Sequence, residues 1–318
     1  MTKRYVGIDL GGTNLKLGLV SAEGELLRRH STPTEAAEGP AHVLARMADA
    51  VRHLAEEAGL ALEDVAAVGV GVPGPLDSEA GVVHFTPNLA GWINVPVRGT
   101  LQDALGRTVV VENDANAAAY GEFRVGAGRQ VQSMFVLTLG TGVGGGIIQD
   151  GRLLRGASDT GAELGHVIVQ YGGRLCGCGN RGCLEAYASA TAVVDRFRRD
   201  ATVSELARRD RLEAKDVFEA AADGDKAAAR IVSETAEYLA VGITSVLHAL
   251  NPEMVVLTGG MMGAGEAFLE EIRCHVRALA FPSAWEACQV RASTLGGDAG
   301  ILGSALAAEA FDRTGQRA

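Results

Sequence analysis

Two short glycine–threonine turns each follow an apolar run and contain the residue types that bind phosphate. They are Gly11-Gly12-Thr13 and Gly140-Thr141-Gly142. Glycine lets backbone N–H groups approach a phosphate closely, and threonine adds a hydroxyl donor. Asp9 lies two residues before the first turn, where its carboxylate can hold Mg²⁺ directly or through water. An ordinary hairpin is the alternative for each turn alone, but two related turns with an upstream acid indicate a nucleotide phosphate site.

Better-known phosphate motifs fit this sequence less well. The spacing G-x-G-x-x-G occurs at 140–145 and again at 69–74. A dinucleotide site requires a helix directly after the turn, whereas the first match continues into the predicted strand Ile147-Ile148 and the second contains Pro73. The sequence also has no Walker loop and no protein-kinase signature. We therefore expect neither a Rossmann site nor a P-loop.

A second set of polar residues suits a hydroxyl-rich ligand. Asn113 and Asp114 stand where an apolar strand gives way to a helix. Asn113 offers both a donor and an acceptor, and Asp114 is either the helix N-cap or a general base for an attacking hydroxyl. Glu163, His166 and Glu185 are further polar residues in glycine-rich surroundings, although each alone would also suit a solvated surface.

A compact group of metal-binding residue types follows the second turn. Cys176, Cys178 and Cys183 lie close together in the sequence, and His166 precedes them. One imidazole and three thiolates fit a closed, tetrahedral structural zinc site with no position left for catalysis. The chain has five cysteines, an odd number that argues against a disulfide framework. Reduced thiols without a metal are the alternative.

Composition restricts the class of protein. The 318 residues are 47% hydrophobic and 21% charged, which indicates a packed globular fold. The formal net charge is −10 and no Lys/Arg stripe is present, so nucleic-acid binding is disfavoured. The N-terminus enters an apolar strand without a signal-like segment, and no run approaches the roughly 18 apolar residues of a spanning helix. We expect a cytoplasmic protein that binds no membrane.

Strands alternate with helices along the chain, which predicts an α/β protein. The same order of elements occurs at the N-terminus and again from Met134: a strand, a glycine turn, a strand, a polar turn and a third strand. We therefore expect an internal duplication. The predicted strands are Tyr5–Leu10, Asn14–Val20, Leu26–His30, Val65–Val72, Thr108–Val111, Met134–Leu139, Val143–Ile148, Arg152–Leu154 and Met254–Thr258, and the predicted helices are Ala41–Ala58, one from about Asp114, Asp225–Leu250, Gly265–Ala280 and Asp298–Asp312.

These motifs together resemble one family. The chain is similar to the ROK family of repressors, uncharacterised frames and sugar kinases from residue 5 to about residue 310, and most like its bacterial ATP-dependent glucokinases. The cysteine string is the most specific part of the resemblance. The motifs are Asp9-x-Gly-Gly-Thr13, Glu112-Asn113-Asp114-Ala115-Asn116, Gly140-Thr141-Gly142, Glu163-Leu164-Gly165-His166 and Cys176-Gly-Cys178-Gly-Asn-Arg-Gly-Cys183-Leu-Glu185.

The resemblance implies a fold and an organisation. The expected fold is α/β, of the actin-like (ribonuclease H-like) sugar kinase type, duplicated into two domains with the active site in a central cleft. We expect a smaller domain at 1–112, completed by the C-terminal helix at about 300–318. A larger domain at 113–299 would hold the zinc loop and the oligomerisation helices, and the family implies a homodimer or homotetramer. Repressor members carry an N-terminal helix-turn-helix, for which a strand starting at Tyr5 leaves no room.

The resemblance also implies a reaction, in which ATP with Mg²⁺ phosphorylates glucose to glucose 6-phosphate with Asp114 as the general base. Kinases of N-acetylglucosamine, N-acetylmannosamine or fructose are the alternatives, as is a non-catalytic sugar-sensing regulator. The expected sugar contacts are Asn88, Asn113, Asp114, Glu163, His166 and Glu185. The expected phosphate and magnesium contacts are Asp9, Gly11, Gly12, Thr13, Gly140, Thr141, Gly142, Gly259 and Gly260, and the expected zinc ligands are His166, Cys176, Cys178 and Cys183.

Overall fold

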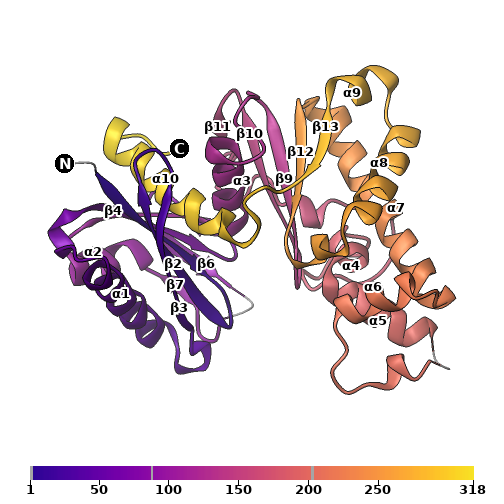
Figure 1. The fold of residues 1–318 in the computed structure, drawn as a ribbon, viewed down its shortest axis with the longest axis horizontal. Helices are drawn as coiled ribbons and strands as arrows, with labels where there is room; N and C mark the ends of the chain where they lie inside the picture. The colour runs from indigo at the N-terminus through magenta and orange to yellow at the C-terminus, as the bar shows by residue number, and fades with distance from the viewer. Residues whose placement is uncertain (1–2, 87–88, 202–203) are drawn as a thin grey trace. The chain divides into compact units, whose positions relative to one another are not determined.

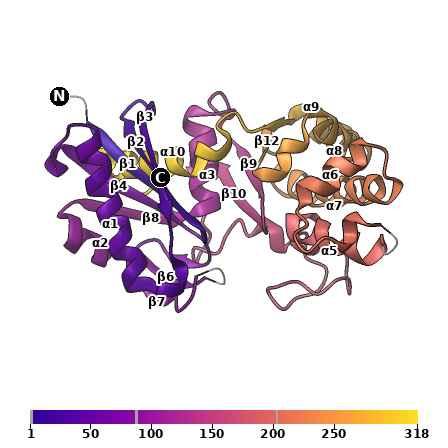
Figure 2. The same cartoon turned by 60° about the horizontal axis from the view of Figure 1, so that its bottom comes forward.

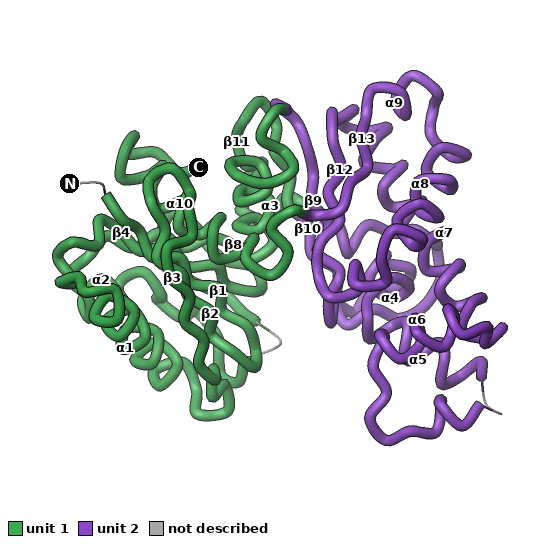
Figure 3. Tube along the Cα trace, viewed as in Figure 1, with its two compact units in different colours: residues 1–130, 146–162, 294–318 green, residues 131–145, 163–293 purple. Residues whose placement is uncertain are grey.

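The computed structural model describes residues 3–86, 89–201 and 204–318. It divides into two compact units (Figure 3). Unit 1 consists of 1–130, 146–162 and 294–318, and unit 2 consists of 131–145 and 163–293. The strand Val143–Gln149 contains one of the points where the chain passes from unit 2 to unit 1.

Unit 1 contains a five-stranded sheet in the order β3-β2-β1-β4-β8. Figure 1 labels its strands β2, β3 and β4. Strand β2 is antiparallel to both of its neighbours, β1 and β3, whereas β1, β4 and β8 run parallel. The carboxyl ends of these three parallel strands therefore meet at one edge of the sheet. The strands are β1 (Arg4–Leu10), β2 (Asn14–Ser21), β3 (Leu26–Pro33), β4 (Val65–Val72) and β8 (Thr108–Asn113).

Alternation along β1 separates the two faces of this sheet. Its even-numbered residues, Val6 to Leu10, share a hydrophobic core with the apolar stripe of helix α1 (Pro40–Glu57). Gly7 points the other way, toward helix α10 (Ala299–Thr314). A Cβ on Gly7 would lie 1.9 Å from the carbonyl oxygen of Ile301, so only glycine lets this helix lie so close to the sheet.

Helix α3 (Asp114–Val125) packs on α10 through glycine in the same way. A Cβ on Gly303 would lie 1.6 Å from the carbonyl oxygen of Ala117. This close packing places α3 in unit 1, although we predicted that the first domain would end at residue 112. Packing units need not coincide with functional domains, so the division at 112, completed by the helix at about 300–318, stays a prediction.

A second five-stranded sheet has the order β11-β10-β9-β12-β13. Its strands β10 and β11 are antiparallel and β9, β12 and β13 are parallel, as are the corresponding strands of the first sheet. The repeated order and directions confirm the predicted duplication. The strands are β9 (Met134–Leu139), β10 (Val143–Gln149), β11 (Arg152–Leu153), β12 (Met254–Thr258) and β13 (Gln289–Ala292).

Unit 2 is rich in helices, and the 25-residue helix α7 (Lys226–Leu250) is packed by α5 (Ala190–Asp200), α6 (Ala214–Ala222) and α8 (Glu266–Leu279) (Figure 2). No helix within the described ranges is long and apolar enough to cross a bilayer.

Several short elements are not predicted by the sequence patterns. Three of them are strands that form a small third sheet: β5 (Leu76–Asp77), β6 (Val82–Phe85) and β7 (Ile93–Val95). The others are the helices α2 (Val97–Leu105), α4 (Glu185–Ala188) and α9 (Pro282–Ala287).

Candidate functional site

The carboxyl edge of the first sheet gathers the site residues predicted for unit 1. Asp9, near the end of β1, is in register with Gly71 of β4, which is in register with Glu112 of β8. Asn113 ends β8, and Asp114 begins α3 directly after it. A Cβ on Gly71 would lie 3.5 Å from the Cα of Asp114, so β4 lies next to the start of α3.

The half-buried carboxylate of Asp9 faces the first turn of α10. A Cβ on Gly300 would lie 3.1 Å from its carboxyl carbon, which leaves little space on that side. Burial raises the pKa of Asp9, and the opposing Lys16 on β2 lowers it. A desolvated carboxylate gains most from a nearby cation, so the position suits a magnesium-holding residue.

The first glycine turn is held at both ends by hydrogen bonds. The Gly11 N–H donates to the carbonyl of Asn14 at 3.1 Å, and the Thr34 hydroxyl donates to the carbonyl of Gly11 at 2.6 Å. The Thr34 N–H donates to the carbonyl of Thr13 at 2.9 Å. Gly12 and Thr13 are exposed, so the fixed turn presents its tip to solvent.

Asn113, rather than Asp114, caps helix α3. Its Oδ1 accepts hydrogen bonds from the N–H groups of Ala115 at 2.9 Å and Asn116 at 3.1 Å. Asp114 is therefore not the N-cap but the first helical residue, and it is half-buried. The cap engages the acceptor of Asn113, and its NH₂ group donates to the carbonyl of Gly74 at 3.5 Å with a further N–H left for a ligand.

Glu112 and Arg155 form a buried ion pair behind this junction, which the sequence motifs do not reveal. Glu112 Oε2 accepts from Arg155 Nε at 2.9 Å, while its Oε1 accepts from the N–H of Asn113 at 3.0 Å and from Asn116 Nδ2 at 3.2 Å. The pair thus fixes the backbone that carries Asp114. The available sequence signal was an acid at the end of an otherwise apolar buried strand.

The second glycine turn, in unit 2, is anchored by the start of α5. The Gly140 N–H donates to the carbonyl of Gly142 at 3.0 Å, which closes the turn. The Ala190 N–H donates to the carbonyl of Gly140 at 2.9 Å, and the Thr191 hydroxyl donates to that of Thr141 at 2.8 Å. Two backbone carbonyls are thereby satisfied on one side of the turn.

Gly259 and Gly260 follow β12, next to the end of β9. The strands pair in parallel with Thr258 opposite Thr138, so the glycine pair lies beside the start of the second turn. A Cβ on Gly259 would lie 2.4 Å from the carbonyl oxygen of Leu139, and its φ of 100° also favours glycine. The structure therefore brings the two glycine segments of unit 2 together.

Glu185 connects the second turn to the cysteine group. Its Oε2 accepts from the N–H of Val143 at 3.0 Å, and its Oε1 lies 3.5 Å from Cys176 Sγ. A Cβ on Gly142 would lie 2.4 Å from the same Oε2. One half-buried carboxylate thus contacts both the second glycine turn and the candidate metal ligands, a link that motif spacing does not predict.

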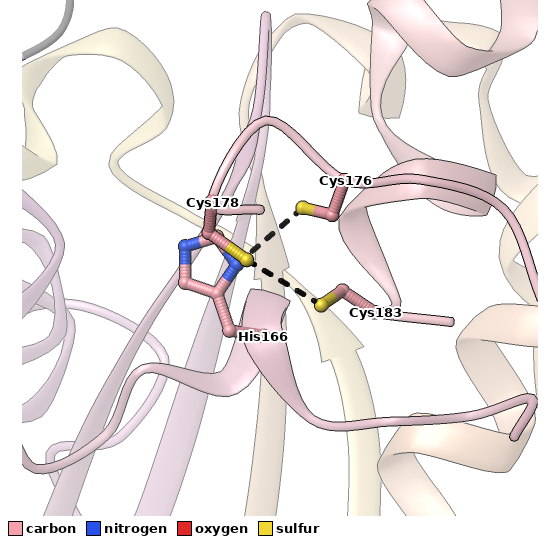
Figure 4. A group of neighbouring side chains, drawn as sticks. All are labelled: His166, Cys176, Cys178 and Cys183. Atoms are coloured by element: carbon pink, nitrogen blue, oxygen red, sulfur yellow. Dashed lines mark hydrogen bonds between the residues drawn. The ribbon is translucent and has the colours of Figure 1, made fainter. Parts of the chain in front are cut away.

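The four predicted metal ligands converge (Figure 4). His166 Nδ1 lies 3.7 Å from Cys176 Sγ, Cys178 Sγ lies 3.7 Å from Cys183 Sγ, and all four donor atoms are within 4.8 Å of one another. Tetrahedral zinc, with bonds of about 2.0–2.3 Å, places its ligand atoms about 3.3–3.8 Å apart. Burial raises the pKa of the Cys176 thiol to about 12, and a bound cation would favour the thiolate. The cluster therefore fits a closed four-coordinate metal centre.

The imidazole of His166 has different neighbours on its two sides. Its Nδ1 faces Cys176, whereas its Nε2 lies 4.0 Å from Glu163 Oε2. Partial burial raises the pKa of Glu163; the nearby His166 lowers it, and Glu185 raises it further. Glu163, His166 and Glu185 are thus grouped around the metal ligands, whereas Asn88 lies outside the described residues.

The sequence model of the ROK family matches residues 5–310. The chain belongs to the ROK family. It is 41% identical over 310 residues to a glucokinase of Thermotoga maritima, covering 95% of this chain and 96% of the relative. The ROK fold is the actin-like, duplicated two-domain fold, in agreement with the repeated sheet order.

Two solved ROK structures superpose closely on the chain. A ROK hexokinase from Thermus thermophilus is 39% identical with a TM-score of 0.84, covering 98% of this chain and 99% of that one. A ROK family glucokinase from Streptomyces griseus, in complex with glucose and AMPPNP, is 36% identical with a TM-score of 0.84, covering 96% and 99%. The similarity to these ROK proteins extends over nearly the whole chain.

Proposed function

We propose that this ROK protein is an ATP-dependent hexokinase that converts glucose to glucose 6-phosphate. The observation that carries the proposal is its near full-length similarity to a glucokinase solved with glucose and an ATP analogue. The T. maritima glucokinase supports the same reaction. Asp9, Asp114 and both glycine–threonine turns are intact, which favours a catalyst over a regulator that has lost activity.

The phosphates of ATP would be held by backbone N–H groups of the two turns and of the Gly259-Gly260 pair. Phosphoryl transfer depends mainly on positioning and on stabilising charge, so rigid turns suit it. The hydrogen bonds of Gly11 and Thr34 in one turn, and of Gly140 in the other, give that rigidity. Mg²⁺ near Asp9, when bound, would neutralise charge on the phosphates.

Asp114 would accept the proton of the attacking sugar hydroxyl at its carboxylate. Its position follows from the Asn113 cap and the Glu112–Arg155 ion pair, which fix the junction between β8 and α3. The NH₂ group of Asn113 would donate a hydrogen bond to another sugar hydroxyl. Because Asp114 is the first residue of α3, the helix backbone fixes the position from which its carboxylate reaches the sugar hydroxyl.

Glu163, His166 and Glu185 would bind the remaining sugar hydroxyls. Zn²⁺ in the cluster of His166, Cys176, Cys178 and Cys183 would be structural, since four protein ligands leave no open position. Ligation through Nδ1 would fix the ring and tautomer of His166 and leave Nε2 for the sugar. In this arrangement the metal shapes the sugar site without touching the reacting atoms.

The reaction is tested by coupled ADP release from Mg-ATP across a panel of sugars, with zinc-replete protein. We expect the highest kcat/KM with glucose. A higher kcat/KM with N-acetylglucosamine, N-acetylmannosamine or fructose would show that this sugar, rather than glucose, is the preferred substrate of a sugar kinase. If no sugar stimulates ADP release, the kinase hypothesis is rejected and a sugar-sensing regulator is favoured.

We also infer a homodimer or homotetramer. Several large apolar side chains of unit 2 are strongly exposed, among them Tyr171 at 98%, Phe281 at 67% and Leu175 at 66%, and burying them at a subunit contact would remove apolar surface from water. Light scattering coupled to gel filtration tests this assembly. A cytoplasmic location stays a prediction from composition.

A further inference from the structure

A second group of metal-binding side chains lies in unit 1, away from every residue assigned above. His30 belongs to the edge strand β3, and His53 and Glu57 lie one turn apart on helix α1. One donor atom from each of the three falls within 4.8 Å of the others. The two imidazole rings have centroids 5.0 Å apart and meet edge to face at 69°, so they converge without stacking.

The spacing of these donors suits a small divalent cation. His53 Nε2 lies 3.3 Å from Glu57 Oε1, which is about the separation of two ligands on tetrahedral zinc. The donor nitrogen of His30, on a half-exposed side chain, lies within 4.8 Å of the other two donor atoms. Two imidazoles and one carboxylate favour borderline metals such as Zn²⁺, Co²⁺ and Ni²⁺ over Mg²⁺, which prefers oxygen ligands.

The charges around the group do not prevent binding. Arg28 is the neighbouring cation, and its Nη1 lies 3.9 Å from Glu57 Oε2, the oxygen that does not face His53. Arg29, next along β3, is paired with Asp298. The chain as a whole carries a formal charge of −10, which favours cation binding.

We propose that His30, His53 and Glu57 form a second metal site, for a borderline divalent transition cation, with water completing the coordination. Three protein ligands and an open position distinguish it from the closed cysteine cluster. The bound ion would join an edge strand to the helix that covers the same sheet. Because β3 pairs with β2, which begins directly after the first phosphate turn, the expected effect is greater stability of unit 1.

The first test is a calorimetric titration of Zn²⁺ into protein whose cysteine cluster is already filled. The parent should bind one further equivalent, and His30→Gln and His53→Gln should each lose it. His42→Gln is the matched control, because His42 also lies on α1 with a carboxylate partner, Glu35, at 2.7 Å. It should keep the further equivalent. No further equivalent in the parent, or its retention in both variants, would overturn the proposal.

The second test separates this site from the cysteine cluster. Co²⁺ added to the zinc-filled protein should give weak visible d–d bands without thiolate charge-transfer absorption. Added Zn²⁺ should raise the thermal midpoint of the parent and of His42→Gln, but not that of His30→Gln or His53→Gln, because a ligand that binds only the folded state stabilises it. Thiolate absorption, or an equal rise of the midpoint in all four proteins, would assign the metal elsewhere.

Discussion

The two glycine–threonine turns occupy the same place in two sheets of the same strand order, yet different groups hold them. The first follows Asp9 in its own strand and is fixed by Thr34. In the second, Thr138 stands where the first has Asp9, and the fixing groups are Thr191 and Glu185 from a distant segment. The two halves share the strand–turn–strand backbone, but the acid beside the turn is Asp9 in the first half and Glu185 in the second.

This difference assigns separate tasks to the two turns. In unit 1 the acid is a desolvated carboxylate with a raised pKa, suited to a magnesium ion beside the phosphates. In unit 2 the acid, Glu185, lies between the turn and the cysteine cluster. The second turn should therefore respond to loss of the metal proposed for the cysteine cluster, whereas the first should not.

The largest expected effect comes from the position where the turns differ most. Asp9→Asn should lower turnover by about 10²-fold or more, in line with the loss of one preorganised electrostatic group. Thr138→Val, the matched change in the second turn, should leave turnover near that of the parent. Steady-state kinetics at saturating Mg-ATP and glucose measure both, and parental turnover in Asp9→Asn would remove this acid from the site.

Asp9→Asn should lower turnover but raise the stability of the folded protein. Burial raises the pKa of Asp9 in the folded protein, so its ionised form costs stability as pH rises through the unfolded pKa and toward the folded one. Asparagine carries no charge and avoids that cost. Without ligands at neutral pH, the variant should therefore melt at a higher temperature than the parent. A lower midpoint would mean that the carboxylate makes a stabilising contact.

The next effect concerns the metal cluster. Cys178→Ser should lower zinc content and weaken glucose binding by about 10- to 100-fold, the range found when the surroundings of a metal site are disturbed. Through Glu185 it should weaken nucleotide binding as well, but less. Elemental analysis and separate calorimetric titrations of glucose and AMPPNP measure these changes. A zinc-free variant that binds glucose as tightly as the parent would separate the metal from the sugar site.

Glycine substitutions in the turns sharpen the comparison further. A Cβ on Gly140 meets no atom within 4 Å, whereas one on Gly142 meets the carboxylate of Glu185. Gly140→Val should therefore weaken AMPPNP binding about tenfold, or about 1.4 kcal/mol, and spare glucose binding. The same result is expected of Gly12→Val, because Gly12 lies at the exposed tip of the first turn. Gly142→Val should weaken both. Unchanged AMPPNP affinity in Gly140→Val would exclude this turn from phosphate binding.

The smallest effect on turnover is expected from the Glu112–Arg155 ion pair behind Asp114. Arg155→Lys keeps the charge but loses the two-pronged contact with Glu112, so kcat should fall by less than about tenfold while the KM for glucose stays constant. Arg155→Met leaves Glu112 buried and unpaired and should destabilise unit 1 by about 3–5 kcal/mol. A lowered melting point with unchanged kcat in Arg155→Lys would make the pair purely structural.

Sequence patterns predicted much of this fold, because its parallel strands are buried runs and its turns need glycine. Strand β12, Met254–Thr258, and the two glycine turns are examples. Patterns did not distinguish Asn113 from Asp114 as the cap, since both residue types cap helices and the choice depends on where β8 ends. Contacts such as Glu112 with Arg155, 43 residues apart, arise only from folding.

The account depends most on Asp114 as the base of a glucose-phosphorylating enzyme. The direct measurement follows glucose 6-phosphate and ADP together, with Mg-ATP and glucose, for the parent and for Asp114→Asn. The parent should form the two products in equal amounts. The variant should be slower by roughly 10²-fold or more, because general-base catalysis is lost, while glucose affinity and the Asn113 cap remain. Parental turnover in the variant, or ADP formed without glucose 6-phosphate, would contradict the account.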